Sequence, residues 1–284
     1  MTYNDIWRRL AAEYGDGEAK AVARILLEDS YGLSYADVVC GGVESLPSAD
    51  AVRLEADVAR LEKGEPVQYV VGCAQFSGRT FCVQRGVLVP RPETEQLCCL
   101  VADDAAKRQG EKSVLDIGTG SGCIAITLSL DIPGAHVSAW DISADALAVA
   151  RHNAAQLGAS VNFSRQDALN PPADNARWDY IVSNPPYICE RERSEMSSNV
   201  LDYEPATALF VPDADPLLFY RSIARYAYRA LKPGGGLFFE INSLYAAETE
   251  EMLRSEGFSD VHTLKDIFGK ERNVVARMIR RIRN

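Results

Sequence analysis

Hydrophobic periodicity divides the chain into two parts. In residues 1 to about 72, apolar positions recur at helical spacing, as at Leu54, Val58 and Leu61, which predicts a bundle of short helices. Thr2 and Ser34 are each followed three residues later by an aspartate, the sequence signature of a capped helix start. From about residue 113, short apolar runs alternate with longer amphipathic stretches. This alternation predicts an α/β fold with a doubly wound, mostly parallel sheet.

Between these parts the period changes from about Val67 onward. Apolar residues punctuated by Gly78 and Gly86 predict a β-hairpin formed from Phe76, Phe81, Val83, Val87 and Val89. Pro92, with acids close behind it, predicts a helix that runs to about Arg108. We therefore expect three parts: a helical domain at 1–72 that serves partner binding, a hairpin and linking helix at 73–112, and an α/β domain at 113–284.

Within the third part, the predicted elements follow one another with short connections. Strands are expected at 114–117, 136–140, 160–164, 178–183, 237–241, 258–264 and 273–279. Helices are expected at 123–128, 143–157, 216–231 and 244–255, with a turn at 233–236. The polar stretch 189–215 has no obvious structure, which favours a substrate-facing loop, with disorder as the alternative.

A glycine-rich turn follows the first of these strands. Its residues are Gly118, Thr119, Gly120, Ser121 and Gly122. Strand, glycine turn and helix in this order let a cofactor approach backbone N–H groups. A dinucleotide fingerprint would need glycine or alanine at position 123, where Cys123 stands. Asp141 ends the next strand and can bind ribose hydroxyls, or it can cap the helix that follows.

The motif Asn184-Pro185-Pro186-Tyr187 follows the buried strand that ends at Ser183. Two consecutive prolines end a strand, because neither offers an N–H to a ladder, so the chain leaves as a stiff loop. Asn184 adds a side-chain acceptor and Tyr187 an aromatic wall. At the carboxyl end of a strand, such a loop can hold a planar –NH2 group, although Asn-Pro is also an ordinary turn starter.

Composition and charge narrow the class of protein. The chain is 47% hydrophobic and 25% charged, which is typical of a globular protein, and its net charge of −10 opposes broad nucleic-acid binding. A local basic cluster stands at the end of the chain, at Arg277, Arg280, Arg281 and Arg283. No apolar run is long enough to cross a bilayer, and no signal peptide is recognisable at the start.

Cysteine and histidine usage bears on compartment and metal binding. None of the seven cysteines forms a C-x-x-C pair, and the three histidines lie far apart in sequence. This usage favours small apolar core cysteines in a reducing cytoplasm and predicts no metal site.

The motifs together resemble a known family. Residues 115–122 look like the cofactor loop of class I S-adenosylmethionine-dependent methyltransferases, and 184–187 like the motif of those that methylate amide or exocyclic nitrogens. The stretch 89–95, with Gln68-Tyr69, Gly72, Phe76 and the helical amino domain, is similar to protein-(glutamine-N5) methyltransferases acting on peptide chain release factors. The resemblance covers nearly the whole chain, and it implies a Rossmann-like methyltransferase fold.

The resemblance implies a role for each motif residue. Gly118, Thr119, Gly120, Ser121 and Gly122 are expected to contact S-adenosylmethionine, and Asp141 to hold its ribose. Asp167 and Ala168 are expected near the adenine, where the family often has an aromatic residue after the acid. Asn184 is expected to touch both cofactor and substrate, and Pro185, Pro186 and Tyr187 to complete the glutamine pocket. The implied partner is a class 1 release factor with its Gly-Gly-Gln loop.

The residue types suit methylation of an amide. An amide nitrogen is a poor nucleophile because its lone pair is delocalised into the carbonyl. If Asn184 and the Pro185 carbonyl accept its two N–H bonds, the lone pair is aimed at the sulfonium methyl for in-line displacement. No general base is needed before transfer, since the methylated cation loses its proton readily.

Three alternatives remain open from the sequence. A ribosomal-protein glutamine methyltransferase shares the asparagine motif, and the amino domain is the discriminator. A DNA or RNA adenine N6-methyltransferase also shares it, but the acidic charge balance and the lack of a nucleic-acid domain oppose that reading. A non-enzymatic nucleotide-binding module has no use for the Asn184 motif.

Overall fold

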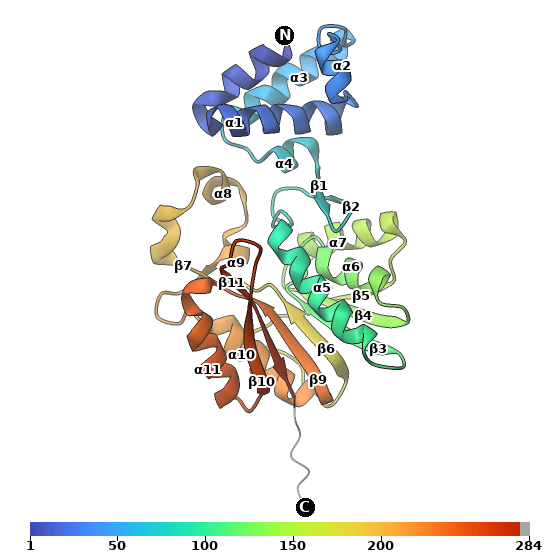
Figure 1. Ribbon diagram of the computed structural model, residues 1–284, viewed down its shortest axis with the longest axis vertical. Helices are drawn as coiled ribbons and strands as arrows, with labels where there is room; N and C mark the ends of the chain where they lie inside the picture. The colour runs from blue at the N-terminus through green and yellow to red at the C-terminus, as the bar shows by residue number, and fades with distance from the viewer. Residues whose placement is uncertain (279–284) are drawn as a thin grey trace, which may run out of the picture. The chain divides into compact units, whose positions relative to one another are not determined.

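The computed structural model, in which residues 1–278 are described, contains a helical unit and a unit built on a central sheet (Figure 1). The helical unit consists of Met1–Cys73, Val83–Arg85 and Met196–Glu204. The sheet unit consists of Ala74–Cys82, Gly86–Glu195 and the chain from Pro205 onward. Each unit therefore draws on segments that are far apart in sequence.

The helical unit begins with two capped helices, as the sequence predicts. Its helices are α1 (Tyr3–Tyr31), α2 (Tyr35–Val39), α3 (Ser48–Leu61), α4 (Val67–Val71) and, from the late segment, α8 (Ser198–Tyr203). Thr2 and Ser34 each accept a hydrogen bond from the backbone of the aspartate three residues on, whose carboxylate returns the contact. Gly15 breaks the regular geometry inside α1 with φ 71°. Apolar faces of α1 and α3 bury Leu10, Leu26 and Val58 together.

The late segment joins the helical unit through specific contacts. The Tyr203 hydroxyl donates to the Lys63 carbonyl at 2.9 Å, and the Arg85 guanidinium lies 4.5 Å from the centre of the Tyr203 ring. Arg85 also forms an ion pair with Glu65 at 3.6 Å. A stretch that follows the Asn184 motif is thus part of the amino-terminal fold.

Within the described residues, the central sheet of this unit has seven strands, in the order β10-β11-β9-β6-β3-β4-β5. The strands are β3 (Lys112–Ile117), β4 (Ala135–Asp141), β5 (Val161–Arg165), β6 (Trp178–Ser183), β9 (Leu231–Glu240), β10 (Ser259–Lys265) and β11 (Glu271–Arg277). Only β11 runs antiparallel to its neighbours β9 and β10. The predicted α/β fold with a mostly parallel sheet is confirmed.

Helices cover both faces of this sheet (Figure 1). They are α5 (Pro92–Ala106), α6 (Cys123–Asp131), α7 (Ala144–Leu157), α10 (Leu218–Ala230) and α11 (Ala246–Ser255), with a 3₁₀ turn at Ser243–Tyr245. Successive strand residues face opposite layers. Val114 packs with α5, α6 and α7, whereas Leu115 packs with α10 and α11. Strands buried on both faces explain the nearly continuous apolar runs in the sequence.

Strand order reverses between β3 and β6, and this reversal positions the site. From β3 the chain moves outward through β4 and β5, and then returns to place β6 on the other side of β3. Open α/β sheets bind ligands at such a switch point, outside the carboxyl ends of the strands. Ile117 and Ser183, the last residues of β3 and β6, are paired in register. The glycine turn and the Asn184 loop therefore leave the sheet at the same level.

The region before β3 agrees with the prediction except in the extent of the hairpin. Residues 67–71 form helix α4, which Pro66 precedes and Gly72 ends in a left-handed conformation with φ 79°. The hairpin is confirmed but short, with β1 (Cys73–Phe76) and β2 (Arg79–Cys82). Val87 and Val89 belong to no strand. They are buried in a loop that ends at Pro90, where Val87 packs against Ala146 and Val149 of α7.

Two further expectations are corrected by the structure. The stretch 189–215 is structured: β7 (Ile188–Cys189) pairs with β8 (Phe210–Val211), and between them lie a 3₁₀ helix at Glu190–Glu195, α8 and α9 (Ala206–Leu209). The turn expected at 233–236 lies inside β9, at a register shift where Gly236 pairs with Tyr180. The predicted strand end at Ile279 lies outside the described residues, as do Arg280, Arg281 and Arg283. Across residues 1–278, no helix is long and apolar enough to span a membrane.

Candidate functional site

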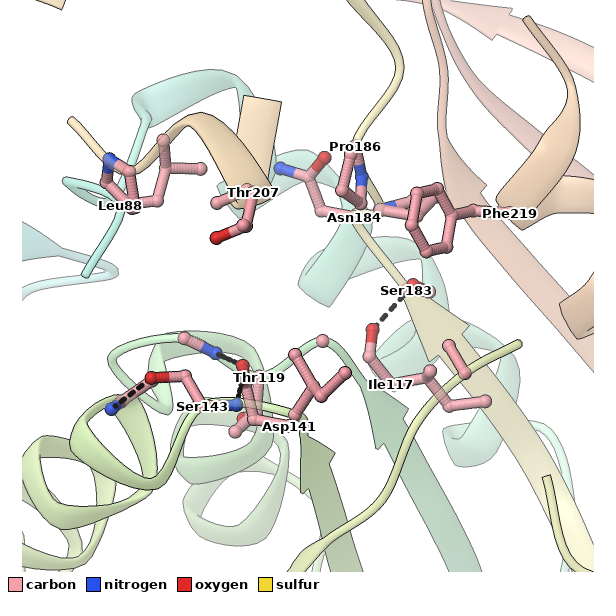
Figure 2. A pocket seen from close by; sticks show the side chains of 18 of the residues that line it. Leu88, Ile117, Thr119, Asp141, Ser143, Ser183, Asn184, Pro186, Thr207 and Phe219 are labelled. Carbon is pink, nitrogen blue, oxygen red and sulfur yellow. Dashed lines mark hydrogen bonds between the residues drawn. The ribbon is translucent and has the colours of Figure 1, made fainter. Parts of the chain in front are cut away.

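A cavity of about 450 Å³ lies at the carboxyl ends of β3, β4, β5 and β6, within the sheet unit. Its size is that of a small-molecule site. Figure 2 shows Thr119, Asp141 and Ser143 on one side of the cavity, with Leu88, Thr207 and Asn184 across from them. Gln166 to Leu169 and the first turns of α10 complete the lining. The strand order thus brings the glycine turn, Asp141 and the Asn184 loop to one space.

The glycine turn owes its shape to left-handed backbone angles. Gly118, Gly120 and Gly122 have φ of 79°, 54° and 84°, which residues with a Cβ rarely adopt. A Cβ on Gly122 would lie 2.9 Å from the Ile126 Cδ1 and 3.1 Å from the Ala150 Cβ. A Cβ on Gly118 or Gly120 would meet nothing within 4 Å. The third glycine therefore serves helix packing, while the first two leave open space.

A buried carboxyl in β3 forms a hydrogen bond with this turn. Asp116 is fully buried in β3 and accepts a hydrogen bond from the Thr119 hydroxyl at 2.6 Å through Oδ2. Among the described residues, nothing bonds to its Oδ1. Burial, with a smaller contribution from the charge of Asp141, raises the pKa of Asp116 to about 7, against the opposing hydrogen bond from Thr119.

Asp141 connects the glycine turn to α7. One oxygen accepts the Gly120 N–H at 2.8 Å, and the other accepts the Ser143 N–H at 2.9 Å. The helix cap is Ser143 itself, whose hydroxyl accepts from the Ala146 N–H, so the capping alternative for Asp141 is wrong. Each carboxylate oxygen keeps a further lone pair, so Asp141 is able to accept hydroxyl groups of a ligand in the cavity.

Asp167 and Ala168 also line the cavity, on the turn after β5. Asp167 shapes this turn, because its carboxylate accepts the Leu169 N–H at 2.8 Å and the Asn170 amide at 2.6 Å. The Ala168 carbonyl accepts from the Ser222 hydroxyl of α10 at 2.7 Å. Ala168 offers only a methyl group to the cavity.

The Asn184 loop begins at a fixed point on the sheet. The Ser183 hydroxyl donates to the Ile117 carbonyl at 2.5 Å, which joins the ends of β6 and β3 (Figure 2). Asn184, Pro185 and Pro186 then line the cavity. The Asn184 amide nitrogen donates to the Thr94 hydroxyl at 3.2 Å.

Tyr187 does not line the cavity. Its hydroxyl donates to a carboxylate oxygen of Glu240, at the end of β9, at 3.1 Å, and its ring packs on the core beside α10. Burial raises the pKa of Tyr187 far above its ordinary value, so the phenol stays protonated. Tyr187 thus anchors the loop from behind and is not the open wall of the cavity.

The sequence reasoning missed several residues of the lining. Leu88, Ile142 and Phe219 bring apolar surface to it, and Thr94 brings a hydroxyl. Ile142 stands directly after a strand-ending acid, and this position is a usable signal in the sequence. In the structure the Ile142 side chain is 55% exposed. Leu88 and Phe219 carry no such signal. In the described part of the chain, no cluster of three or more metal-ligand side chains occurs.

The arrangement suits a ligand that has both apolar surface and a planar polar group. Aliphatic and proline side chains exclude water, while Asp141 and Asn184 provide acceptors at separate points of the lining. Histidine is not among the residues that line this cavity. The site therefore favours chemistry that depends on positioning and dipoles over proton transfer by an imidazole.

Two family models match the chain. The model described as "PrmC N-terminal domain" matches residues 5–72, and that described as "Methyltransferase small domain" matches residues 99–203. The first falls within the helical unit, and the second includes the glycine turn and the Asn184 loop.

Curated relatives match over nearly the full length. A release factor glutamine methyltransferase of Bacteroides thetaiotaomicron is 46% identical over 264 residues, covering 93% of this chain and 94% of the relative. One of Flavobacterium psychrophilum is 40% identical over 267 residues, covering 93% and 94%. Among solved structures, a methyltransferase from Pyrococcus furiosus aligns with a TM-score of 0.52 at 16% identity, covering 82% of this chain and all of the other, which shows a shared fold.

Proposed function

Because this chain belongs to the release factor glutamine methyltransferases, we propose that it methylates the side-chain amide nitrogen (N5) of the glutamine in the Gly-Gly-Gln motif of class 1 peptide chain release factors. The methyl donor in this proposal is S-adenosylmethionine. The observation that carries the proposal is the level register of β3 and β6, which places the glycine turn and the Asn184 loop at one cavity.

The residues around the glycine turn fit S-adenosylmethionine. Gly118 and Gly120 leave open space where a side chain would stand, and Asp141 keeps lone pairs for ribose hydroxyls. Ile142 and Leu169, both partly exposed beside Ala168, provide the apolar contact for an adenine that an aromatic residue often provides in the family. When bound, S-adenosylmethionine supplies a methyl group made electrophilic by its sulfonium.

The Asn184 loop holds the amide of the substrate in our proposal. Asn184 Oδ1 and the Pro185 carbonyl accept its two N–H bonds, which directs the nitrogen lone pair toward the side of the cavity formed by the glycine turn. The same two dipoles stabilise the positive charge that develops on this nitrogen. Pro186 stiffens the loop, and Tyr187 anchors it through Glu240. No base among these residues is required, because the methylated nitrogen releases its proton to water.

The helical unit recognises the folded substrate in our proposal. A glutamine flanked by glycines offers little side-chain surface beside the target, so affinity must come from remote contacts. We assign these contacts to residues 1–72, with 73–112 as the connection and 113–284 as the catalytic part. We expect no direct nucleic-acid contact, since the net charge is −10.

The test is methyl transfer by the purified full-length protein. Folded class 1 release factor, ribosomal proteins and DNA are each incubated with S-adenosylmethionine, and mass spectrometry locates the modified residue. We expect one methyl group on the Gly-Gly-Gln glutamine and none on a release factor with glutamate at that position. Modification of a ribosomal protein or of adenine alone contradicts the proposal, and so does calorimetry that detects NADH binding but no S-adenosylmethionine binding.

A further inference from the structure

A buried carboxylate lies behind the Asn184 loop. Glu240, the last residue of β9, is 2% exposed, and both of its oxygens accept hydrogen bonds from the site. The Thr94 hydroxyl donates to Oε2 at 2.6 Å, and the Tyr187 hydroxyl donates to Oε1 at 3.1 Å. A carboxylate accepts only, so the single proton of each hydroxyl is committed to Glu240.

Because these two protons face Glu240, the donor and acceptor of each hydrogen bond in the network are fixed. Because the Thr94 proton faces Glu240, the Thr94 oxygen offers only a lone pair to Asn184, and the Asn184 Nδ2 donates to it at 3.2 Å. An amide with its nitrogen bound in this way must turn its oxygen elsewhere. No described residue donates to Asn184 Oδ1, and Asn184 lines the cavity (Figure 2).

We propose that Thr94 and Glu240 are positioning residues that fix the Asn184 amide with its oxygen toward the substrate. The proposal rests on the role of Asn184 in the proposed function. A flipped Asn184 presents two N–H donors to a substrate amide that itself offers two N–H donors, so the pair cannot form. The direction of the network thus decides whether the site accepts an –NH2 group.

Protonation of Glu240 reverses this direction. A neutral carboxyl can donate to Thr94, which then donates to Asn184, and the asparagine oxygen becomes the bound atom. Burial raises the pKa of Glu240, against the hydrogen bonds from Thr94 and Tyr187 and the charge of Arg272 on β11. The other groups that face it are Glu93 on α5, Cys123 on α6 and the Tyr220 hydroxyl on α10, which donates to its backbone carbonyl.

The experiment replaces the hydroxyl and keeps the shape. Thr94→Val removes the relay, Thr94→Ser keeps it, and Thr249→Val is the matched control. Thr249 is a fully buried threonine in α11 whose hydroxyl bonds the Tyr245 carbonyl at 2.7 Å, away from the cavity lining. Turnover on release factor, KM and calorimetric affinity for S-adenosylmethionine are measured for each full-length variant.

Thr94→Val is expected to lower kcat by roughly 10- to 100-fold, as misplacement of a reacting group does, while KM and cofactor affinity change by less than about threefold. Thr94→Ser and Thr249→Val are expected to retain kcat within about threefold of wild type. A Thr94→Val protein with kcat within about twofold of wild type overturns the proposal.

A spectroscopic measurement separates this inference from the proposed function. The side-chain ¹⁵N signal of Asn184, identified by its loss in Asn184→Asp, is expected to titrate with Glu240 in the wild type without any methyl acceptor. Thr94→Val should abolish this response. A signal that is insensitive to pH, or unchanged by Thr94→Val, overturns the inference even if release factor is methylated.

Glu240→Gln gives an independent variant in case Thr94→Val does not fold. Its amide oxygen can still accept from Thr94 while its nitrogen donates to Tyr187, and it has no proton to gain. We expect the kcat of the wild type to fall at acid pH as Glu240 gains a proton, and we expect this fall to be absent in Glu240→Gln and present in the control Thr249→Val. Persistence of that loss in Glu240→Gln overturns the proposal.

Discussion

The glycine turn and the Asn184 loop leave neighbouring strands at the same level, yet they are held in different ways. The glycine turn is fixed by partners no more than 32 residues away: Thr119 bonds Asp116, Gly120 bonds Asp141, and the Asn153 amide donates to the Ser121 carbonyl. The Asn184 loop is fixed by remote partners, since Thr94 precedes it by 90 residues and Glu240 follows Tyr187 by 53. The glycine turn is held by β3, β4 and α7, which adjoin it in the chain, and the Asn184 loop is held by the more distant α5 and β9.

This difference predicts which property a substitution in each loop should change. Changes at the glycine turn act on a locally closed unit, so they should alter ligand affinity or folding stability. Changes at the Asn184 loop act on a group whose backbone is already fixed by two prolines, so they should alter the chemical step alone. Three substitutions test this separation.

Asn184→Ala should give the largest effect. It removes the acceptor that orients the substrate amide, and loss of one such preorganised group lowers kcat on the order of 10²- to 10³-fold. The free energy of unfolding should change little, because Asn184 lies at a strand end with its side chain at the cavity. Kinetics on release factor check this, with the exposed Asn162→Ala on β5 as control. Near wild-type turnover at saturating substrate refutes the proposed role.

Asp116→Asn should change how the free energy of unfolding depends on pH. The folded pKa of about 7 lies above the ordinary value of 3.8, so the folded protein holds a proton between these pH values that the unfolded chain releases. Stability from this group is therefore greatest in acid and is lost as pH rises from about 4 to about 7, by at most about 4 kcal/mol.

Denaturant unfolding of the ligand-free protein at pH 5 and pH 8 measures this loss. Asparagine can still accept from Thr119 and does not titrate, so Asp116→Asn should be more stable than wild type at pH 8 by roughly 2–4 kcal/mol and should lose less stability between the two pH values. Asp103→Asn, at an exposed carboxyl on α5, is the control. Equal pH dependence in Asp116→Asn and wild type shows that Asp116 does not titrate in this range.

Asp141→Ala should give the smallest of the three effects. It removes the acceptor proposed for the ribose and should weaken S-adenosylmethionine binding by about 1–3 kcal/mol, the usual cost of losing hydrogen bonds to a charged group. Calorimetry on Asp141→Ala and on Asp145→Ala, an exposed acid in the first turn of α7, makes the comparison. Equal affinities in these two variants remove Asp141 from the proposed cofactor site.

The same difference explains what the sequence could predict. The turn glycines follow β3, and Asp141 ends the next strand along the chain, so their arrangement follows from the spacing of strand, turn and helix and from the rule that ligands bind at the switch point. The α/β fold with a mostly parallel sheet also followed from the alternation of apolar runs with helical stretches. Helix starts at Thr2 and Ser34 were predictable because the cap is a local contact.

What could not be predicted depends on contacts between distant segments. Glu240 ends β9 directly after the apolar run 237–239, and nothing near it in sequence indicates that its partners are Thr94 and Tyr187. Tyr187 has an aromatic ring that suits a cavity wall, but the buried carboxylate draws its hydroxyl to the other side.

The helical unit has a consequence for how the protein is made. Its last piece, Met196–Glu204, is synthesised long after Cys73, because the whole first half of the sheet unit lies between them. At about 5–20 residues per second, this interval is on the order of ten seconds. During that time Lys63 and Arg85 have been made but lack Tyr203, their partner in the finished fold. The helical unit is thus completed only after the Asn184 motif has been translated.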